Sequence, residues 1–310
     1  MQIQWFPGHM HKAAKAVRET LPSVDVLIEV LDARIPFSSQ NPMIAQLRGD
    51  KPCIKLLNKS DLADPEMTLV WQEYLEKQRN IRTLATDVTT HDSLRQITDL
   101  CHKLVPATGL DDEYRNVQAM IIGIPNVGKS TLINALAGRT IAKTGNEPAV
   151  TKNQQRIKLD YGITLIDTPG MMWPKIEHEN SGYRLAATGA IKETATDNTE
   201  VAFATAEYLL EAYPERLIER YQLESLPAND LELIEAIGRF RGCLRSGGDV
   251  LLEKASNILI SELRSGVLGR ITMEDPERVE REQEEVLVAR EAKRLKDETR
   301  KQGFKKKRNR

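Results

Sequence analysis

The stretch that decides the fold is VQAMIIGIPNVGKS, residues 117–130. It opens with an apolar run typical of a buried strand, continues through the pattern GxxxxGK[ST], and leads into a segment with helical spacing of its apolar residues. Gly123 and Gly128 let the backbone turn so that successive N–H groups point at a phosphate, and the helix N-terminus adds positive potential. The stretch therefore predicts a strand, a phosphate-binding loop and a helix; the alternative is a glycine-rich turn that binds nothing.

This pattern assigns roles to the residues of the loop. Lys129 is predicted to contact the β- and γ-phosphates and thereby to assist phosphoryl transfer, and Ser130 is predicted to give a hydroxyl to Mg²⁺. The loop residues predicted to bind the nucleotide are Asn126, Val127, Gly128, Lys129, Ser130 and Thr131.

A second motif, DTPG at residues 167–170, ends another apolar run. The carboxyl ends of strands are where α/β sheets bind ligands, so Asp167 is predicted to hold Mg²⁺ through water and the Gly170 N–H to sense the γ-phosphate. Between the two motifs, Thr151 lies in a polar, loop-like stretch and is predicted to close onto Mg²⁺ when the γ-phosphate is present. The alternative for Thr151 is an ordinary loop threonine.

The motif NKSD, residues 58–61, follows an apolar strand and predicts a base-binding loop. Guanine presents an N1–H and an N2 amino group along one edge, and the Asp61 carboxylate can accept both, whereas adenine has no such pair of donors. The Lys59 stem is expected to lie along the base, and Asn58 to tie this loop to the phosphate loop. The nearest candidate for a second base-contacting loop is Ala85-Thr86, which departs from the usual Ser-Ala-Lys type.

Apolar runs alternate with amphipathic stretches from Val24 to Asp167, which predicts an α/β domain with a mainly parallel sheet. The predicted strands are Val24–Leu31, Pro52–Leu57, Ile81–Ala85, Val117–Gly123, Arg156–Asp160 and Ile163–Asp167, and the predicted crossover helices are Pro65–Lys77, Asp92–Leu104 and Lys129–Ala137.

After Pro174 the pattern predicts only helices, near Gly182–Ile191, Glu200–Ala212, Asp230–Leu244 and Val250–Leu263. A charged segment beyond Pro276 has too little apolar surface for a core and predicts an exposed helix that frays into a basic tail. The expected domains are residues 1–178, a nucleotide-binding unit with an N-terminal motif; residues 179–275, a helical unit; and residues 276–310, the charged helix and tail.

Composition narrows the class of protein. The 310 residues are 40% hydrophobic and 29% charged, ordinary values for a globular chain, with a formal net charge of -1. The last eleven residues nevertheless carry seven basic and no acidic side chains, which favours an anionic partner over a merely solvated charged face. The pattern predicts no membrane span or signal peptide, and the three cysteines are expected to be buried, reduced thiols in a cytoplasmic protein.

The order of the motifs is unusual, because Asp61 precedes Gly123 whereas ordinary Ras-like GTPases have the phosphate loop first. A parallel sheet tolerates this order if the old termini are joined and a surface loop is opened, since each strand keeps its neighbours. In this order the nucleotide-binding unit ends just after Gly170, so the predicted γ-phosphate sensor leads directly into the helical unit.

With this order, the motifs WFPGHM at residues 5–10, DAR at 32–34, GIPNVGKS at 123–130 and RSGVLGRIT at 264–272 closely resemble the circularly permuted YlqF/RbgA family of ribosome biogenesis GTPases. The resemblance spans nearly the whole chain, although the basic tail is less clearly a family feature. It implies a circularly permuted Ras-like GTPase domain followed by a small all-helical, RNA-binding domain. It also implies a GTPase that acts in late assembly of the bacterial large ribosomal subunit, binds ribosomal RNA as a monomer, and is activated by the particle.

The resemblance also suggests how hydrolysis is assisted. Many GTPases place a glutamine after the acidic motif to orient the attacking water, whereas this chain has Met171 and Met172. His9, by likeness to family members, is a candidate catalytic group; the alternative is that residues 5–10 only pack or contact RNA. Asn126, by likeness to potassium-activated GTPases, is a candidate K⁺ ligand; the alternative is that it only shapes the loop.

The sequence is also compatible with two other functions. One is a nucleotide-gated RNA-binding scaffold with little turnover, which the two methionines permit. The other is a GTPase coupled to small-molecule or tRNA modification, which would need a further catalytic cluster that the helical region does not offer.

Overall fold

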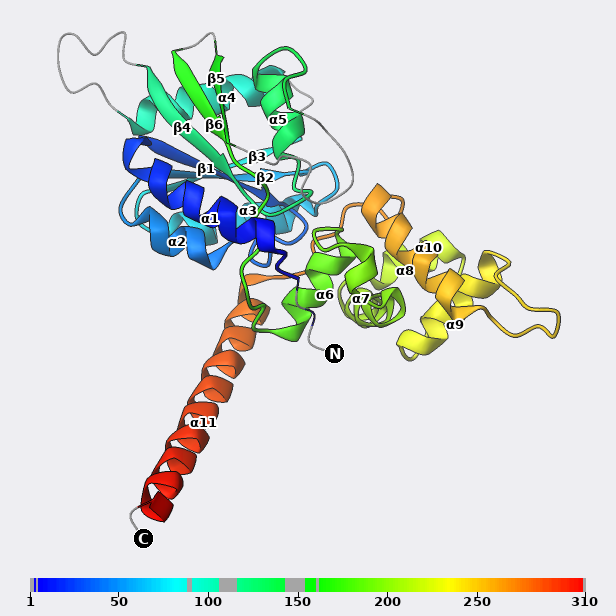
Figure 1. Ribbon diagram of the computed structural model, residues 1–310. Helices are drawn as coiled ribbons and strands as arrows, with labels where there is room; N and C mark the ends of the chain where they lie inside the picture. The colour runs from blue at the N-terminus through cyan, green and yellow to red at the C-terminus, as the bar shows by residue number, and fades with distance from the viewer. Residues whose placement is uncertain are drawn as a thin grey trace.

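The computed structural model describes residue 3 and residues 5–87, 91–105, 116–142, 154–159 and 162–308. Figure 1 shows a part built around a β-sheet, a separate group of helices beside it, and a long C-terminal helix that projects away from both. We call the first two the sheet part, residues 5–170, and the helical part, residues 179–265.

The sheet has six strands in the order β3-β2-β1-β4-β6-β5. All neighbours are parallel except β5 and β6, which are antiparallel. The predicted α/β class with a mainly parallel sheet is confirmed, and each predicted strand is present within two residues of its expected bounds. The strands are β1 Val26–Asp32, β2 Cys53–Asn58, β3 Ile81–Thr86, β4 Val117–Ile122, β5 Gln155–Leu159 and β6 Ile163–Asp167.

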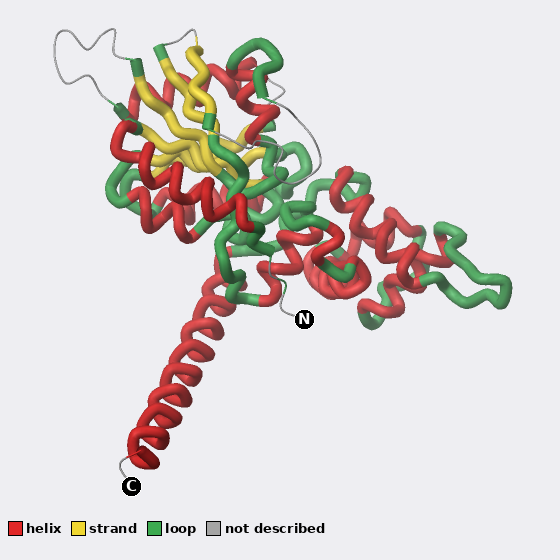
Figure 2. Tube along the Cα trace, in the orientation of Figure 1, coloured by secondary structure: helices red, strands yellow, loops and turns green. Residues whose placement is uncertain are grey.

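Both faces of the sheet are covered, which explains why its central strands are mostly apolar. The charged residues in mid-strand, Glu29 of β1 and Lys55 of β2, are buried as an ion pair at 3.3 Å. On one face, α4 (His91–Leu104) and α5 (Lys129–Leu136) pack on alternate residues of β1, including Val26 and Ile28. On the other face, α1 (Gly8–Thr20) and α2 (Pro42–Arg48) pack on Leu27. Farther along that face, α3 (Pro65–Glu76) covers Leu31. Figure 2 shows the strands enclosed between these helices.

Two helices of the sheet part were not predicted. In the α1 helix the apolar residues Met10, Ala13, Ala14 and Val17 are spaced as on one face of a helix, and all four side chains are buried. This spacing is a sequence signal for the helix. The α2 helix is only seven residues long. Its signals are local: Pro42 occupies the first turn and the Asn41 side chain caps the start by accepting from the Met43 N–H at 3.0 Å.

The helical part consists of α6 to α10, and α7 lies at its centre against α6, α9 and α10. Among the described residues beyond Pro174 there is no strand, only an isolated bridge between Leu244 and Val250, as expected. The α8 helix was missed, and α9 ends at Phe240 rather than at Leu244 because Gly242 leaves the helical conformation at φ 67°. The helices are α6 Glu179–Ala187, α7 Asn198–Ala212, α8 Pro214–Tyr221, α9 Asp230–Phe240 and α10 Leu252–Ser265.

The C-terminal helix α11 (Pro276–Arg308) differs from its expected form. Val279, in its first turn, is fully buried against Leu31, Trp71 and Leu75, and Glu282 is also buried. The expectation of an exposed helix is therefore wrong for the first two turns. Val279 and, three residues later, Glu282 are enough to pack these turns against the rest of the protein. The described side chains from residue 283 onward are almost all exposed.

The cysteines and the membrane prediction can also be compared with the structure. Cys53 and Cys101 are buried free thiols, whereas Cys243 is half-buried, so burial was predicted wrongly for that one. Cys243 follows the end of α9, where the chain turns at the surface. Every described helix is too short or too polar to cross a membrane.

Candidate functional site

The phosphate loop has the predicted strand–loop–helix form, running from β4 through residues 123–128 into α5. Gly128 caps α5 in the left-handed region, at φ 96°. The Lys129 side chain is buried and curls back over the loop, where its Nζ donates to the carbonyl oxygens of Gly123 at 3.0 Å and Ile124 at 2.7 Å. The loop therefore holds its ammonium group beneath the N-terminus of a helix, which is the arrangement that binds a phosphate.

Asp167 ends β6 directly beside the loop, because its register partner on β4 is Ile121. Its Oδ2 is buried and has no hydrogen-bond partner among the described residues. Burial raises the pKa of Asp167 to about 6, against the opposing charge of Lys129, and burial lowers the pKa of Lys129 to about 8. The free carboxylate oxygen of Asp167 suits a bound cation, and the buried ammonium group of Lys129 suits a bound polyanion. Mg²⁺ together with a nucleotide would supply both.

The segment after Asp167 lies against the phosphate loop. A Cβ on Gly170 would lie 3.0 Å from Pro125 Cα and 3.2 Å from Lys129 Nζ, so a larger residue would push the phosphate loop away by a few tenths of an ångström. The next residue, Met171, donates its N–H to the Gly123 carbonyl at 3.2 Å. Both Met171 and Met172 are buried, so neither thioether is available to orient water. The structure thus brings the predicted γ-phosphate sensor onto the loop and places two buried methionines after it, where many GTPases have a glutamine.

The base-binding loop is attached to the phosphate loop by two side chains. Asn58 Nδ2 donates to the Val127 carbonyl at 2.6 Å, which confirms the predicted tie. Lys59 Nζ donates to the Asn126 carbonyl at 2.7 Å, while its backbone takes a left-handed conformation at φ 59°. Asp61 is exposed at the rim, where a carboxylate can meet the edge of a base.

Ala85-Thr86, the predicted second base-contacting loop, lies next to this motif. Thr86 ends β3 in register with Asn58, and its carbonyl accepts the Ser60 N–H at 3.3 Å. The structure therefore places Ala85 and Thr86 beside the NKSD loop, and their contact with the nucleotide stays a prediction.

The sequence showed Asp32 and Arg34 only as part of a family motif, without a role. Asp32 is buried at the end of β1 and accepts from Arg34 Nε at 2.9 Å, Arg34 Nη2 at 2.7 Å and Lys59 Nζ at 2.8 Å. Burial alone would raise the pKa of Asp32, but Arg34 and Lys59 hold it well below its usual range. Charged residues at the end of a mostly apolar, buried strand were the available signal, because buried charges persist only when paired.

Two predicted catalytic residues lie near the junction with the helical part. Asn126, in a left-handed conformation at φ 61°, donates its Nδ2 to the carbonyl of Gly189 at 2.8 Å. His9 lies in the first turn of α1, but its side chain is outside the described part of the chain; its neighbour Met10 accepts the Met172 N–H at Sδ, 3.3 Å away. Thr151 is also outside the described residues.

Comparison with known proteins agrees with this geometry. Residues 118–221 match the family model described as "50S ribosome-binding GTPase". The chain is 46% identical to ribosome biogenesis GTPase A of Bacillus pumilus over 284 residues, covering 89% of this chain and 100% of the relative. It is 33% identical to mitochondrial ribosome-associated GTPase 1 of Ictalurus punctatus, covering 87% and 92% of the two chains.

Solved structures of the same kind are also similar. GDP-bound YlqF, described as "TM YlqF", has a TM-score of 0.61 at 27% identity, with 84% of this chain and 99% of that chain covered. GNP-bound YlqF from T. maritima has a TM-score of 0.60 at 27% identity, with 86% and 99% covered. The permuted motif order, the joined phosphate and base loops, and these likenesses together show that the chain is a GTPase and belongs to the ribosome biogenesis GTPase A (YlqF/RbgA) family.

Proposed function

We propose that this GTPase acts as a switch in late assembly of the large ribosomal subunit, in the cytoplasm, where it binds ribosomal RNA and hydrolyses GTP when the particle stimulates it. The observation that carries the proposal is the pair of hydrogen bonds from Asn58 and Lys59 to the phosphate loop, because they form one site from a guanine-reading loop and a phosphate-binding loop.

In this proposal the nucleotide contacts follow the motifs. Asp61 accepts from the guanine edge, Lys129 neutralises the β- and γ-phosphates, and the Gly170 N–H meets the γ-phosphate. Mg²⁺ would be held by Ser130 and Asp167, joined by Thr151 when the γ-phosphate is bound, and would neutralise the charge that develops during transfer. The partnerless Asp167 oxygen supports this assignment.

The catalytic proposal rests on the burial of the two methionines. Because Met171 and Met172 offer no polar group, a partner-induced arrangement must supply one. His9 is our candidate, since α1 contacts the backbone of Met172 through Met10. Asn126 is our candidate for a K⁺ ligand beside the phosphates, where the cation would replace the charge of an arginine finger.

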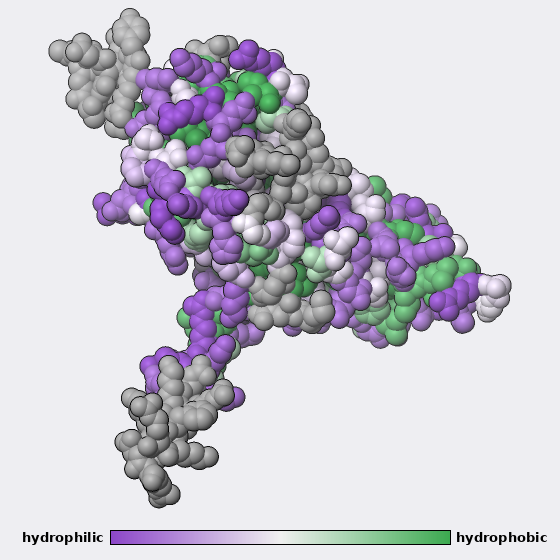
Figure 3. Space-filling view, in the orientation of Figure 1, coloured by the Kyte–Doolittle hydropathy of each residue, from purple (hydrophilic) through white to green (hydrophobic). Residues whose placement is uncertain are grey.

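The ribosomal proposal rests on the names of the relatives and on the surface of the helical part. Its relatives are named for ribosome biogenesis and for association with ribosomes. Figure 3 shows apolar side chains at the end of the helical part that lies far from the sheet, where Figure 1 places α9. Leu231 and Phe240 of α9 are exposed, as are Arg241 and Arg245, which follow it. Apolar side chains can pack against bases and neighbouring arginines can pair with phosphates, so this surface suits RNA.

The division into units is part of the proposal. Residues 1–178 would bind and hydrolyse GTP, residues 179–275 would bind RNA, and residues 276–310 would add a basic tail. The burial of Val279 and the contacts of Glu285 with His178 and of Arg290 with Glu177 support a third segment that is anchored along its first half.

The alternative function is a nucleotide-gated RNA-binding scaffold with little turnover, which the buried methionines favour. A tRNA-modifying activity has no such support, since the described residues contain no group of three or more His, Cys, Asp or Glu side chains placed to hold a further metal.

GTP hydrolysis measured with and without large-subunit precursors, in K⁺ and in Na⁺, tests the proposal. We expect the particle to raise turnover and K⁺ to raise it further; unchanged turnover with the particle would favour the scaffold. His9→Ala should abolish most of the stimulation, whereas the matched control His11→Ala, two positions along α1, should retain it. Equal rates in both salts would remove the K⁺ role of Asn126.

A further inference from the structure

A short segment between the helical part and α11 runs along the base-binding loop. We call residues 270–274 the strap. Arg270 Nε donates to the Asp61 carbonyl at 3.2 Å, and the Ile271 N–H donates to the Leu62 carbonyl at 3.0 Å. The Thr272 hydroxyl accepts the Asp64 N–H at 3.1 Å. Three successive strap residues therefore bond to the loop that carries Asp61.

The strap also reaches the other base-contacting residue, Lys59. The Met273 N–H donates to the Arg34 carbonyl at 2.7 Å, and the Arg34 guanidinium holds Asp32, which accepts from Lys59. Arg34 is buried, and the negative charge of Asp61 contributes to raising its pKa, so its guanidinium lies within electrostatic range of the base-reading carboxylate. Both side chains that would face guanine are thus connected to the strap.

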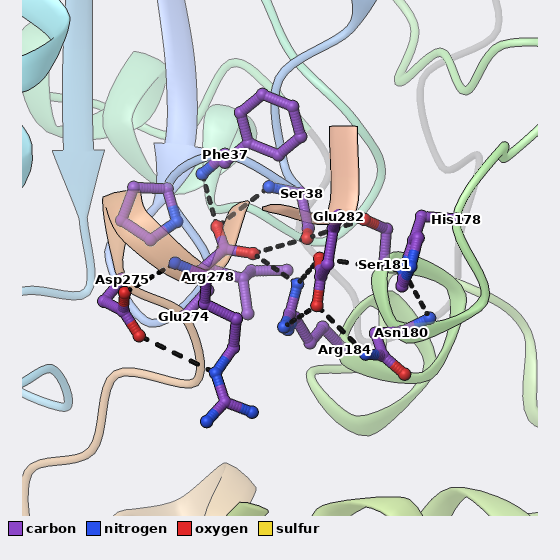
Figure 4. A network of polar contacts seen from close by, with 12 residues as sticks. Phe37, Ser38, His178, Asn180, Ser181, Arg184, Glu274, Asp275, Arg278 and Glu282 are labelled. Atoms are coloured by element: carbon purple, nitrogen blue, oxygen red, sulfur yellow. Dashed lines mark hydrogen bonds and ion pairs between the residues drawn. The ribbon is translucent and has the colours of Figure 1, made fainter. Parts of the chain in front are cut away.

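Glu274 anchors the end of the strap. Its side chain is fully buried and accepts from the N–H groups of Phe37 and Ser38, from the Ser38 hydroxyl, and from Arg184 Nη1 at 3.4 Å. Its carbonyl accepts from Trp71 Nε1 at 3.0 Å. Figure 4 shows the carboxylate at the centre of this network, between the loop after β1 and Arg184 of α6. A buried carboxylate with all its acceptor positions used is costly to move, so it fixes the strap in place.

We propose that Glu274 is a positioning residue for guanine recognition, holding the strap so that Asp61 and Lys59 keep the geometry that reads the base. The proposal rests on the proposed guanine-reading role of Asp61 and adds a determinant outside the NKSD motif. The strap enters the site from a part of the chain more than two hundred residues beyond that motif.

The test compares GTP with ITP, which lacks the N2 amino group that Asp61 would accept. The ratio of the ITP and GTP dissociation constants measures how well the Asp61 carboxylate is placed, independently of the phosphates. For Glu274→Ala we expect this ratio to fall by about five-fold or more, since a displaced carboxylate loses one charge-assisted hydrogen bond. General destabilisation would weaken both nucleotides equally and leave the ratio unchanged.

Two further variants make the test sharper. Glu274→Gln keeps the size of the side chain and one oxygen that can accept from the Phe37 and Ser38 N–H groups. We therefore expect it to keep most of the wild-type ratio of the ITP and GTP dissociation constants. It also replaces Glu274→Ala in the test if that variant does not fold. Glu282→Gln removes charge from the other carboxylate on Arg184, whose Nη2 lies 2.7 Å from Glu282 Oε1, without touching the strap. It should lower the melting temperature and leave the ratio at its wild-type value.

The outcomes separate this proposal from the one on which it rests. If wild-type protein shows no preference for GTP over ITP, the guanine-reading role of Asp61 fails first. If wild-type protein discriminates and folded Glu274→Ala discriminates equally well, Glu274 is only structural and the proposal is overturned. An equal loss of the ratio in Glu282→Gln would also overturn it, because the effect would then belong to Arg184.

Discussion

The phosphate side and the base side of this site are built in different ways. Lys129 is held by carbonyl groups five and six residues earlier in the chain, within a single motif. Lys59 is held by Asp32 and Asn126, 27 and 67 residues away, and Asp61 is braced by Arg270, 209 residues away. A locally built loop is determined by a short sequence, whereas the base loop depends on the fold of the whole chain.

The largest expected effect comes from a change that damages both sides at once. A Cβ on Gly128 would lie 2.2 Å from Asn58 Nδ2, and the residue has a φ of 96°. Gly128→Ala should weaken GTP binding about a thousand-fold, as backbone strain of about 1–3 kcal/mol is added to the displacement of Asn58.

Gly138→Ala is the matched control, because Gly138 also has a left-handed φ of 61° but nothing lies within 4 Å of its Cβ position. Titration calorimetry gives the GTP affinity of both variants. The difference between them separates the effect of backbone strain from that of the contact between the added Cβ and Asn58. Equal affinities for the two variants would mean that the loops are independent.

Asp61→Asn acts on the base side alone. An amide suits xanthine better than guanine, so GTP affinity should fall about a hundred-fold and XTP affinity should rise, on the basis of about 1.5–3 kcal/mol for each hydrogen bond to a charged group. Competition of GTP and XTP against a fluorescent GDP analogue measures both. Unchanged GTP affinity would contradict the assignment of Asp61.

Acidification acts on the phosphate side through Asp167. The pKa of Asp167 is about 6, so a proton competes with Mg²⁺ below that pH, and apparent Mg²⁺ affinity should drop about ten-fold between pH 7 and pH 5. Without metal, the raised pKa stabilises the folded chain fully below about pH 3.8, and this contribution is lost as the pH rises through about 6.

Mg²⁺ titrations of wild type and Asp167→Asn across this pH range check the assignment. The variant should bind Mg²⁺ weakly at every pH, with no slope near pH 6. A wild-type affinity that stays flat would show that Asp167 is not the titrating ligand.

The smallest expected effect tests the tie between the two sides. Asn58→Ala removes the 2.6 Å bond to the Val127 carbonyl and should weaken GTP about five-fold, for a net hydrogen bond of about 1 kcal/mol. Asn80→Ala is the control for loss of an asparagine in a left-handed conformation (φ 59°), because among the described residues its side chain donates to the Asp50 carbonyl at 2.8 Å, away from the phosphate loop. Equal affinities for the two variants would show that the tie does not support binding.

The same contrast explains what the sequence could and could not predict. The six strands were predicted because each is an apolar run between amphipathic stretches, and the phosphate loop was predicted from the spacing of its glycines. Both signals are local in the sequence. The tie through Asn58 was predicted because the motif defines it. The role of Arg34 was missed although its partner Asp32 is only two residues away. The role of Glu274 was missed because a lone glutamate in the sequence gives no sign of a partner more than two hundred residues away. The docking of Val279 was missed for the same reason.

The chain enters the helical part through the segment that follows Gly170 and leaves it through the strap, and direct contacts such as Asn126 Nδ2 to the Gly189 carbonyl at 2.8 Å also join the two parts. The entering segment lies beside the phosphate loop, where Met171 bonds Gly123, and the strap lies beside the base loop, where Ile271 bonds Leu62. The helical part is therefore connected to both ends of the nucleotide site, to the γ-phosphate end through the segment after Gly170 and to the base end through the strap.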